Sequence, residues 1–189
     1  TLSAQAEDKQ LYIIGVFHAD VSNSFSSVVK KGVEQAGKDL NVKVEFVGPD
    51  KFDVVAEGQL IQAAIAKKPD GIFVSLPDCD ALKPAVQEAL KEGIPVMSFN
   101  AGAACFRDAG SLVHVAEDGV QGGVGAGERL VKLGAKNVIC LVHEPGNAFL
   151  EDRCKGMAMA LEKAGGKSTN VATSLADPSV TKGAIEAAF

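Results

Sequence analysis

A short apolar run followed by a segment of helical periodicity recurs along this chain. Such repeated βα units are typical of an open parallel sheet whose faces are covered by helices. In sheets of this kind, ligands bind at the carboxyl ends of the strands. The alternation therefore predicts an α/β protein, and it makes the loops that follow the strands the first place to look for functional residues.

The chain up to residue 117 contains five predicted strands. The nearly continuous apolar run over residues 11–17 is typical of a central parallel strand covered on both faces. Apolar residues then recur with helical spacing from Phe25 to about Leu40. The same alternation predicts further strands at 42–47, 71–75, 94–99 and 112–116, and helices at 53–67 and 80–92. The Gly/Ala-rich stretch between the last two strands is expected to be a loop without a helix.

The alternation continues beyond Asp118. It predicts helices at 119–133, 147–164 and from 179 onward, and strands at 137–142 and 169–174. We therefore expect an N-terminal lobe over residues 7–117 and a C-terminal lobe over residues 118–189. Because a sheet of two strands is marginal by itself, the second lobe is expected to be partial within these residues.

Charge and hydropathy exclude two classes of partner. Lys and Arg together number 19 against 24 Asp and Glu, so the net charge is −5, and no basic stripe is present. Such a chain repels phosphate backbones, and no nucleic acid is expected to bind. No apolar stretch approaches the ~20 residues that a membrane-spanning helix needs, so no direct membrane insertion is expected.

Several short motifs occur along the chain, and their order is stronger evidence for a family resemblance than any single motif. They are Asn23-Ser24-Phe25 after the first strand, Pro69-Asp70-Gly71-Ile72, Pro77-Asp78-Cys79-Asp80-Ala81, Gly93-Ile94-Pro95-Val96, Val115-Ala116-Glu117-Asp118 before Gly122-Gly123, and Arg153-Cys154-Lys155-Gly156-Met157. In order and spacing the chain resembles the periplasmic ribose-type sugar-binding proteins of ABC transporters. The resemblance implies the type 1 periplasmic binding protein fold, two Rossmann-like parallel-sheet lobes of flavodoxin-like strand order. It also implies a sugar or polyol held between the lobes and a membrane permease as partner, in a chain that is here truncated.

The resemblance assigns ligand-binding roles to four residues. Asn23 and Phe25 would supply an amide and an apolar face, and Arg153 would donate to sugar oxygens from the second lobe. Asn100 follows the fourth strand, where the family has an Asp-Arg pair, so a ligand other than ribose is expected. Three of the four also have a structural alternative: Asn23 as a helix cap, Phe25 as a core residue and Arg153 as a solvated helix residue.

Position alone adds two candidates to this set. His18 and Asp20 lie in the loop after the first strand. At the carboxyl end of a strand, their polarity suits either ligand contact or simple solvation. We include both among the predicted ligand-binding residues.

No constellation for catalysis, metal or cofactor binding is evident. The glycines from Gly123 to Gly127 resemble a dinucleotide fingerprint, but the third comes one residue early and the segment has helical periodicity. His18, His114 and His143 are too scattered for a metal site. We therefore expect no enzyme activity, no cofactor and no metal. The alternatives are a Rossmann-like α/β oxidoreductase, and the sugar-sensing domain of a LacI-type repressor, against which the absence of an N-terminal helix-turn-helix argues.

The N-terminus and the cysteines bear on the cellular compartment. Ala4-Gln5-Ala6 has the form of a signal-peptidase site, which would place the mature protein in the periplasm or outside the cell, although a polar chain end would read the same way. Cys79 and Cys105 follow neighbouring predicted strands, so an oxidising compartment could join them. Cys140 and Cys154 are predicted to be buried thiols.

Overall fold

The computed structural model describes residues 9–175 and 177–188. The Ala4-Gln5-Ala6 sequence lies outside this part of the chain. By their contacts the residues form two compact units. The first holds the chain through Ser75 together with Asp80–Ser98 and Phe106–Val113, and the second holds Leu76–Cys79, Phe99–Cys105 and the chain from His114 onward.

The larger sheet has five strands. They are β1 (Tyr12–Val16), β2 (Lys43–Val47), β3 (Gly71–Ser75), β4 (Val96–Phe99) and β5 (His114–Val115). Their order is β2-β1-β3-β4-β5, and β1 runs parallel to both of its neighbours, with Ile13 opposite Val44 and Gly71. This is the flavodoxin-like order, so the predicted fold class is confirmed.

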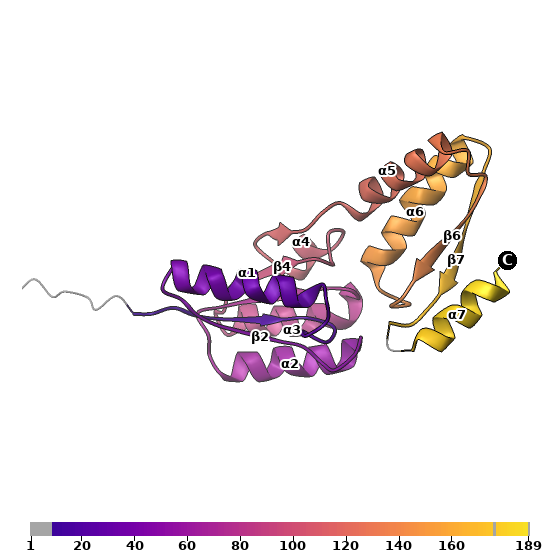
Figure 1. Ribbon diagram of the computed structural model, residues 1–189. Coiled ribbons are helices and arrows are strands. Elements are labelled where there is room, and N and C mark those ends of the chain that lie inside the picture. Colours follow the sequence, from indigo (N-terminus) through magenta and orange to yellow (C-terminus); the bar gives the residue numbers. More distant parts are fainter. Residues whose placement is uncertain (1–8, 176, 189) are drawn as a thin grey trace, which may run out of the picture. The chain divides into compact units, whose positions relative to one another are not determined.

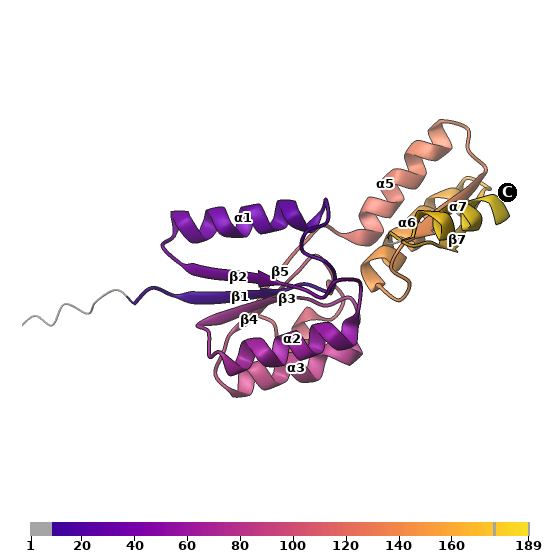
Figure 2. The ribbon, with the colours of Figure 1, turned by 60° about the horizontal axis from the view of Figure 1, so that its bottom comes forward.

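Helices cover both faces of this sheet. They are α1 (Ser26–Asp39), α2 (Val54–Ala66), α3 (Cys79–Lys91) and the short α4 (Phe106–Ala109). Figure 2 shows α1 on one face and α2 with α3 on the other. Strand residues such as Ile14, Ile72 and Val74 are buried between them, at 2% exposure or less. Burial on both faces explains why the strands are nearly continuous apolar runs.

The prediction of a helix-free loop between the fourth and fifth strands is wrong. Phe106–Ala109 forms α4, a single turn in which only Ala109 is buried. Four residues are too few to show a helical period in the sequence. The Gly/Ala-rich composition just before them favoured a loop instead.

The smaller sheet pairs β6 (Asn137–Val142) with β7 (Lys167–Ala172) in parallel. Its helices are α5 (Gly119–Lys132), α6 (Ala148–Lys163) and α7 (Pro178–Ala187). Figure 1 shows α5 and α6 on one side of the two strands and α7 on the other. No helix in the described residues is long and apolar enough to cross a bilayer.

Helices α5 and α6 meet along a line of glycines. Gly123 and Gly127 of α5 and Gly156 of α6 are all buried. A Cβ atom at Gly123 would overlap the Arg153 carbonyl oxygen, and one at Gly156 would overlap the Val120 carbonyl oxygen. The backbones can come this close only without side chains. The glycine pattern that resembles a dinucleotide fingerprint is therefore a helix-packing surface.

All four cysteines of the chain form disulfides. Cys79 and Cys105 are joined with a Cα–Cα distance of 6.2 Å, the pairing that the sequence left open. The prediction that Cys140 and Cys154 are free buried thiols is wrong, because they are joined with a Cα–Cα distance of 5.7 Å. Packing of α6 on β6 brings the two residues together, and neither the strand pattern nor the helix pattern reveals which side chains face one another.

Candidate ligand-binding site

The loop after β1 is tied to the end of β3 through His18. The His18 ring is 2% exposed, and its Nδ1 atom lies 2.7 Å from the Ser75 hydroxyl oxygen. The Phe52 ring packs against the His18 ring in a T-shaped arrangement, with a centroid distance of 5.6 Å. The His18 carbonyl accepts a hydrogen bond from the Asp53 amide at 3.1 Å. His18 thus joins neighbouring strand ends from a buried position, and its contact with a ligand stays a prediction.

Asp20 organises the same loop. Its carboxylate accepts hydrogen bonds from the Ser22 amide at 2.8 Å and the Ser22 hydroxyl at 2.7 Å. The hydrogen bond from the Ser22 amide has the larger effect and that from the Ser22 hydroxyl the smaller, and both hold the pKa of Asp20 below its ordinary value. The carboxylate is therefore charged at neutral pH and already has local donors.

Asn23 connects this loop to the start of α1. Its Oδ1 atom accepts from the amides of Phe25 and Ser26, both at 2.9 Å, and its Nδ2 atom donates to the Asp20 carbonyl at 2.8 Å. These bonds satisfy two amides that the first helical turn leaves without carbonyl partners. The capping alternative considered for Asn23 is thus present in the structure, and ligand contact would have to use its remaining amide hydrogen.

Replacement of Asn23 by alanine is expected to lower the free energy of unfolding by about 1 kcal/mol, the usual cost of losing a helix cap. Asn23→Asp keeps an acceptor oxygen for the Phe25 and Ser26 amides and serves as the matched control, with a smaller loss. Urea denaturation measures both variants. An Asn23→Ala protein as stable as the parent would show that these hydrogen bonds do not stabilise α1.

Phe25 presents an aromatic surface beside this loop. Its side chain is 52% exposed, and its ring centroid lies 6.1 Å from that of Phe17. The alternative interpretation of Phe25, as a core residue of the first helix, is therefore wrong. An exposed ring at the carboxyl edge of a parallel sheet could pack against the apolar face of a sugar.

Asn100 directly follows β4 in a left-handed conformation with φ of 60°. Its amide donates to the Val115 carbonyl at 3.1 Å, and the next residue, Ala101, accepts from the Leu76 amide at 3.0 Å. Asparagine tolerates this conformation better than most residues. No hydrogen bond of the Asn100 side-chain amide is found among the described residues, and the side chain is half-buried.

Arg153 is already partnered within the second unit. Its guanidinium pairs with the Glu117 carboxylate and lies over the Phe149 ring, 4.7 Å from the centroid. Both charged side chains are about half exposed, at 46% for Arg153 and 53% for Glu117. The pair borders a pocket of about 290 Å³ that Met157 also lines. Arg153 is thus more than a solvated helix residue, and its predicted contact with a ligand would compete with Glu117.

The loop after β6 holds a buried polar pair that the sequence analysis missed. Glu144 and Asn147 are 9% and 2% exposed, and the Asn147 amide donates to the Glu144 carboxylate at 2.7 Å. The Asn147 oxygen accepts from the Phe149 amide at the start of α6. The rule that functional residues follow parallel strands could have found both.

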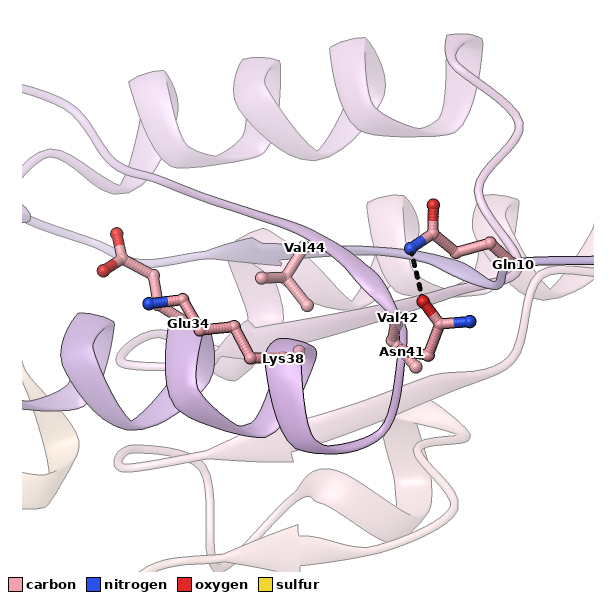
Figure 3. A pocket seen from close by; sticks show the side chains of 7 residues that line it. Gln10, Glu34, Lys38, Asn41, Val42 and Val44 are labelled. Atoms are coloured by element: carbon pink, nitrogen blue, oxygen red, sulfur yellow. Dashed lines mark hydrogen bonds between the residues drawn. The ribbon is translucent and has the colours of Figure 1, made fainter.

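A separate pocket of about 340 Å³ lies at the opposite end of the first sheet. Figure 3 shows Gln10 and Asn41 facing each other there, and the Gln10 amide donates to the Asn41 oxygen at 3.1 Å. Both residues precede strands, so this pocket lies at the amino ends. It is not where an open parallel sheet is expected to bind its ligand.

The described residues contain no group of three or more potential metal ligands. His114 lies in β5, where burial lowers its pKa. His18 is hydrogen-bonded to Ser75, as described above.

The sequence is similar to those of a sugar-binding protein and of a transcriptional regulator. The ribose import binding protein RbsB of Bacillus subtilis (strain 168) is 28% identical over 152 residues, which are 79% of this chain and 48% of that protein. The HTH-type transcriptional regulator DegA of the same organism is 26% identical over 165 residues, 86% of this chain and 47% of that protein. The chain thus spans about half the length of these two relatives.

A solved structure with the same fold is the carbohydrate transporter from Acidothermus cellulolyticus 11B in complex with myo-inositol. It is 32% identical, superposes with a TM-score of 0.88, and is matched over 95% of this chain and 61% of its own. Residues 14–189 match the periplasmic binding protein domain, which is nearly the whole sequence. This chain therefore belongs to the periplasmic binding protein domain family.

Proposed function

We propose that this chain is the ligand-binding part of a solute-binding protein that delivers an uncharged sugar or polyol to the permease of an ABC transporter, without any chemical step. Its location would be the periplasm or the cell exterior. The observation that carries the proposal is the polar carboxyl edge of the five-stranded sheet, with the Asn100 amide after β4, in a member of this family. The ribose import protein and the myo-inositol complex among the similar proteins support it.

The charges near the candidate residues favour an uncharged ligand. The Asp20 carboxylate already accepts from Ser22, and the Arg153 guanidinium is already paired with Glu117. The Arg153 charge is thus balanced by Glu117, and the Asp20 carboxylate keeps its charge but already uses Ser22 as a hydrogen-bond donor. An amide such as that of Asn100 offers two donors and an acceptor, which suits hydroxyl groups that must all find partners when they leave water.

The proposal is tested by titrating the protein with myo-inositol in a calorimeter. Replacing Asn100 by alanine is expected to weaken binding by roughly 1 to 3 kcal/mol, the cost of leaving a desolvated polar partner unsatisfied. Asn41→Ala is a matched control, because Asn41 is also left-handed, with φ of 52°, but lies at the amino ends of the strands. Binding by Asn100→Ala as tight as by the parent would remove Asn100 from the site.

A thermal-shift screen widens the test to other neutral sugars, since a ligand selective for the folded state raises the melting temperature. A shift with nicotinamide dinucleotides and with no sugar would contradict the proposal and favour the oxidoreductase alternative.

The sensory domain of a LacI-type regulator is the second candidate, favoured by the similarity to the transcriptional regulator DegA. Both candidates bind a small polar ligand, so the compartment separates them. Release of the native protein by osmotic shock would support the transport role. Retention with the cytosol would support the regulator.

A further inference from the structure

The Cys79–Cys105 disulfide joins the two loops that follow β3 and β4. Cys79 is the first residue of α3, and Cys105 immediately precedes α4. The Cα atoms are 6.2 Å apart, and both residues are half-buried. The bond is thus a cross-link at the edge of the sheet where this fold binds ligands, and not one inside the core.

The two joined loops also touch through their backbones. The Leu76 amide donates to the Ala101 carbonyl at 3.0 Å, and both residues are completely buried. Gly102 has a φ of +111°, and a Cβ atom there would lie 2.7 Å from the Leu76 Cβ. The contact continues the pairing of β3 and β4 past their ends, into the residues next to Asn100.

Asn100 lies between β4 and this contact. A left-handed conformation is uncommon for residues other than glycine, and it persists where the surrounding structure fixes it. Here the Asn100 amide is held by the Val115 carbonyl on one side, and Ala101 is held by Leu76 on the other. The disulfide closes the same loop four residues beyond Ala101.

We infer that the Cys79–Cys105 disulfide is a positioning element of the binding site, which keeps residues 99–105 in the conformation that presents the Asn100 amide. This inference rests on the proposed function and deepens it. Without the disulfide, the loop is held by backbone hydrogen bonds, among them those of Asn100 and Ala101, and by the packing of Gly102 on Leu76. Open conformations then become populated, and the apparent affinity falls in proportion to the fraction of closed loop.

The test compares two double variants of the full chain. Cys79→Ser/Cys105→Ser removes the proposed positioning bond, and Cys140→Ser/Cys154→Ser removes the other disulfide as a matched control. Hydrogen–deuterium exchange followed by mass spectrometry is expected to show about tenfold faster exchange over residues 99–105 in the first variant only, as for a loop whose open fraction rises about tenfold. Strand β3 should stay protected in both.

Affinity for myo-inositol is the second readout. It is expected to fall in Cys79→Ser/Cys105→Ser by the factor by which the closed fraction falls, about 1.1-fold if a tenth of the loops are open and about twofold if half are, and to stay unchanged in the control. If the parent does not bind myo-inositol or another neutral sugar, the proposed function fails, while the exchange result still decides whether the disulfide fixes the loop. Unchanged exchange over residues 99–105 would overturn the inference whatever binds.

A further measurement tests the inference even if the Cys79→Ser/Cys105→Ser variant does not fold. Brief treatment of the folded Cys140→Ser/Cys154→Ser protein with a dithiol cleaves only the Cys79–Cys105 bond in a preformed chain. Faster exchange of residues 99–105 that reverses on reoxidation with oxidised glutathione supports the inference. Exchange that does not respond to the dithiol, with cleavage verified by thiol labelling, contradicts it.

Discussion

Replacing Gly156 by leucine is expected to lower the free energy of unfolding by about 3 kcal/mol, at the upper end for overpacking a buried site. The first added carbon would overlap the Val120 carbonyl oxygen and come within 2.9 Å of the Val124 nitrogen. Both are backbone atoms of α5, so no side chain can rotate away to make room. Helices α5 and α6 must separate instead. Thermal and urea denaturation measure the loss.

Gly122 provides the matched control for this substitution. It lies in the same helix pair, but a Cβ atom there meets nothing within 4 Å. Gly122→Ala is therefore expected to raise stability by up to ~1 kcal/mol, because alanine is the better helix former. If α5 and α6 are packed backbone to backbone, the change in the free energy of unfolding should have opposite signs at the two glycines. Equal effects would mean that the helices are not packed backbone to backbone.

Removal of the Cys140–Cys154 disulfide by a double alanine substitution is expected to cost about 3 kcal/mol, the chain-entropy value for a loop of about 15 residues. The bond joins β6 to α6 across a sequence separation of 14. For a chain of this size that loss corresponds to a melting temperature lower by roughly 6 to 12 °C. Differential scanning calorimetry of the oxidised parent and the double variant measures the difference.

Treatment with a reductant gives the control for this prediction. The parent should lose stability on reduction, whereas a chain that lacks all four cysteines should not respond. If the double variant melts at the same temperature as the parent, the bond does not stabilise the second unit.

The sequence predicted elements well where the apolar pattern was strong. Strands β3 and β6 have the predicted bounds, and α5 differs from its prediction at one end by one residue. Strand β7 begins and ends two residues earlier than predicted, because its register is fixed by pairing with β6, with Lys167 opposite Asn137. Its own sequence, Lys-Ser-Thr-Asn-Val-Ala, has too few apolar residues to mark those bounds.

Ligand contact by the candidate residues stays a prediction, whereas their places in the fold can be compared with the sequence. Parallel strands direct the loops that follow them to one edge, so the places of His18 after β1 and of Asn100 after β4 follow from the strand pattern alone. The capping bonds of Asn23 and the pairing of Arg153 with Glu117 depend on side-chain directions that only the folded chain fixes. The same is true of Cys140, whose partner faces it from a different element.

The disulfide from Cys79 to Cys105 encloses almost all of α3 and the whole of β4 in a covalent ring. A protease that cuts a single peptide bond inside this ring adds one water molecule and releases no fragment. The nicked chain keeps its two halves together until a reductant separates them. On a non-reducing gel such damage is invisible, and the protein can outlast a cut that would divide a cysteine-free relative in two.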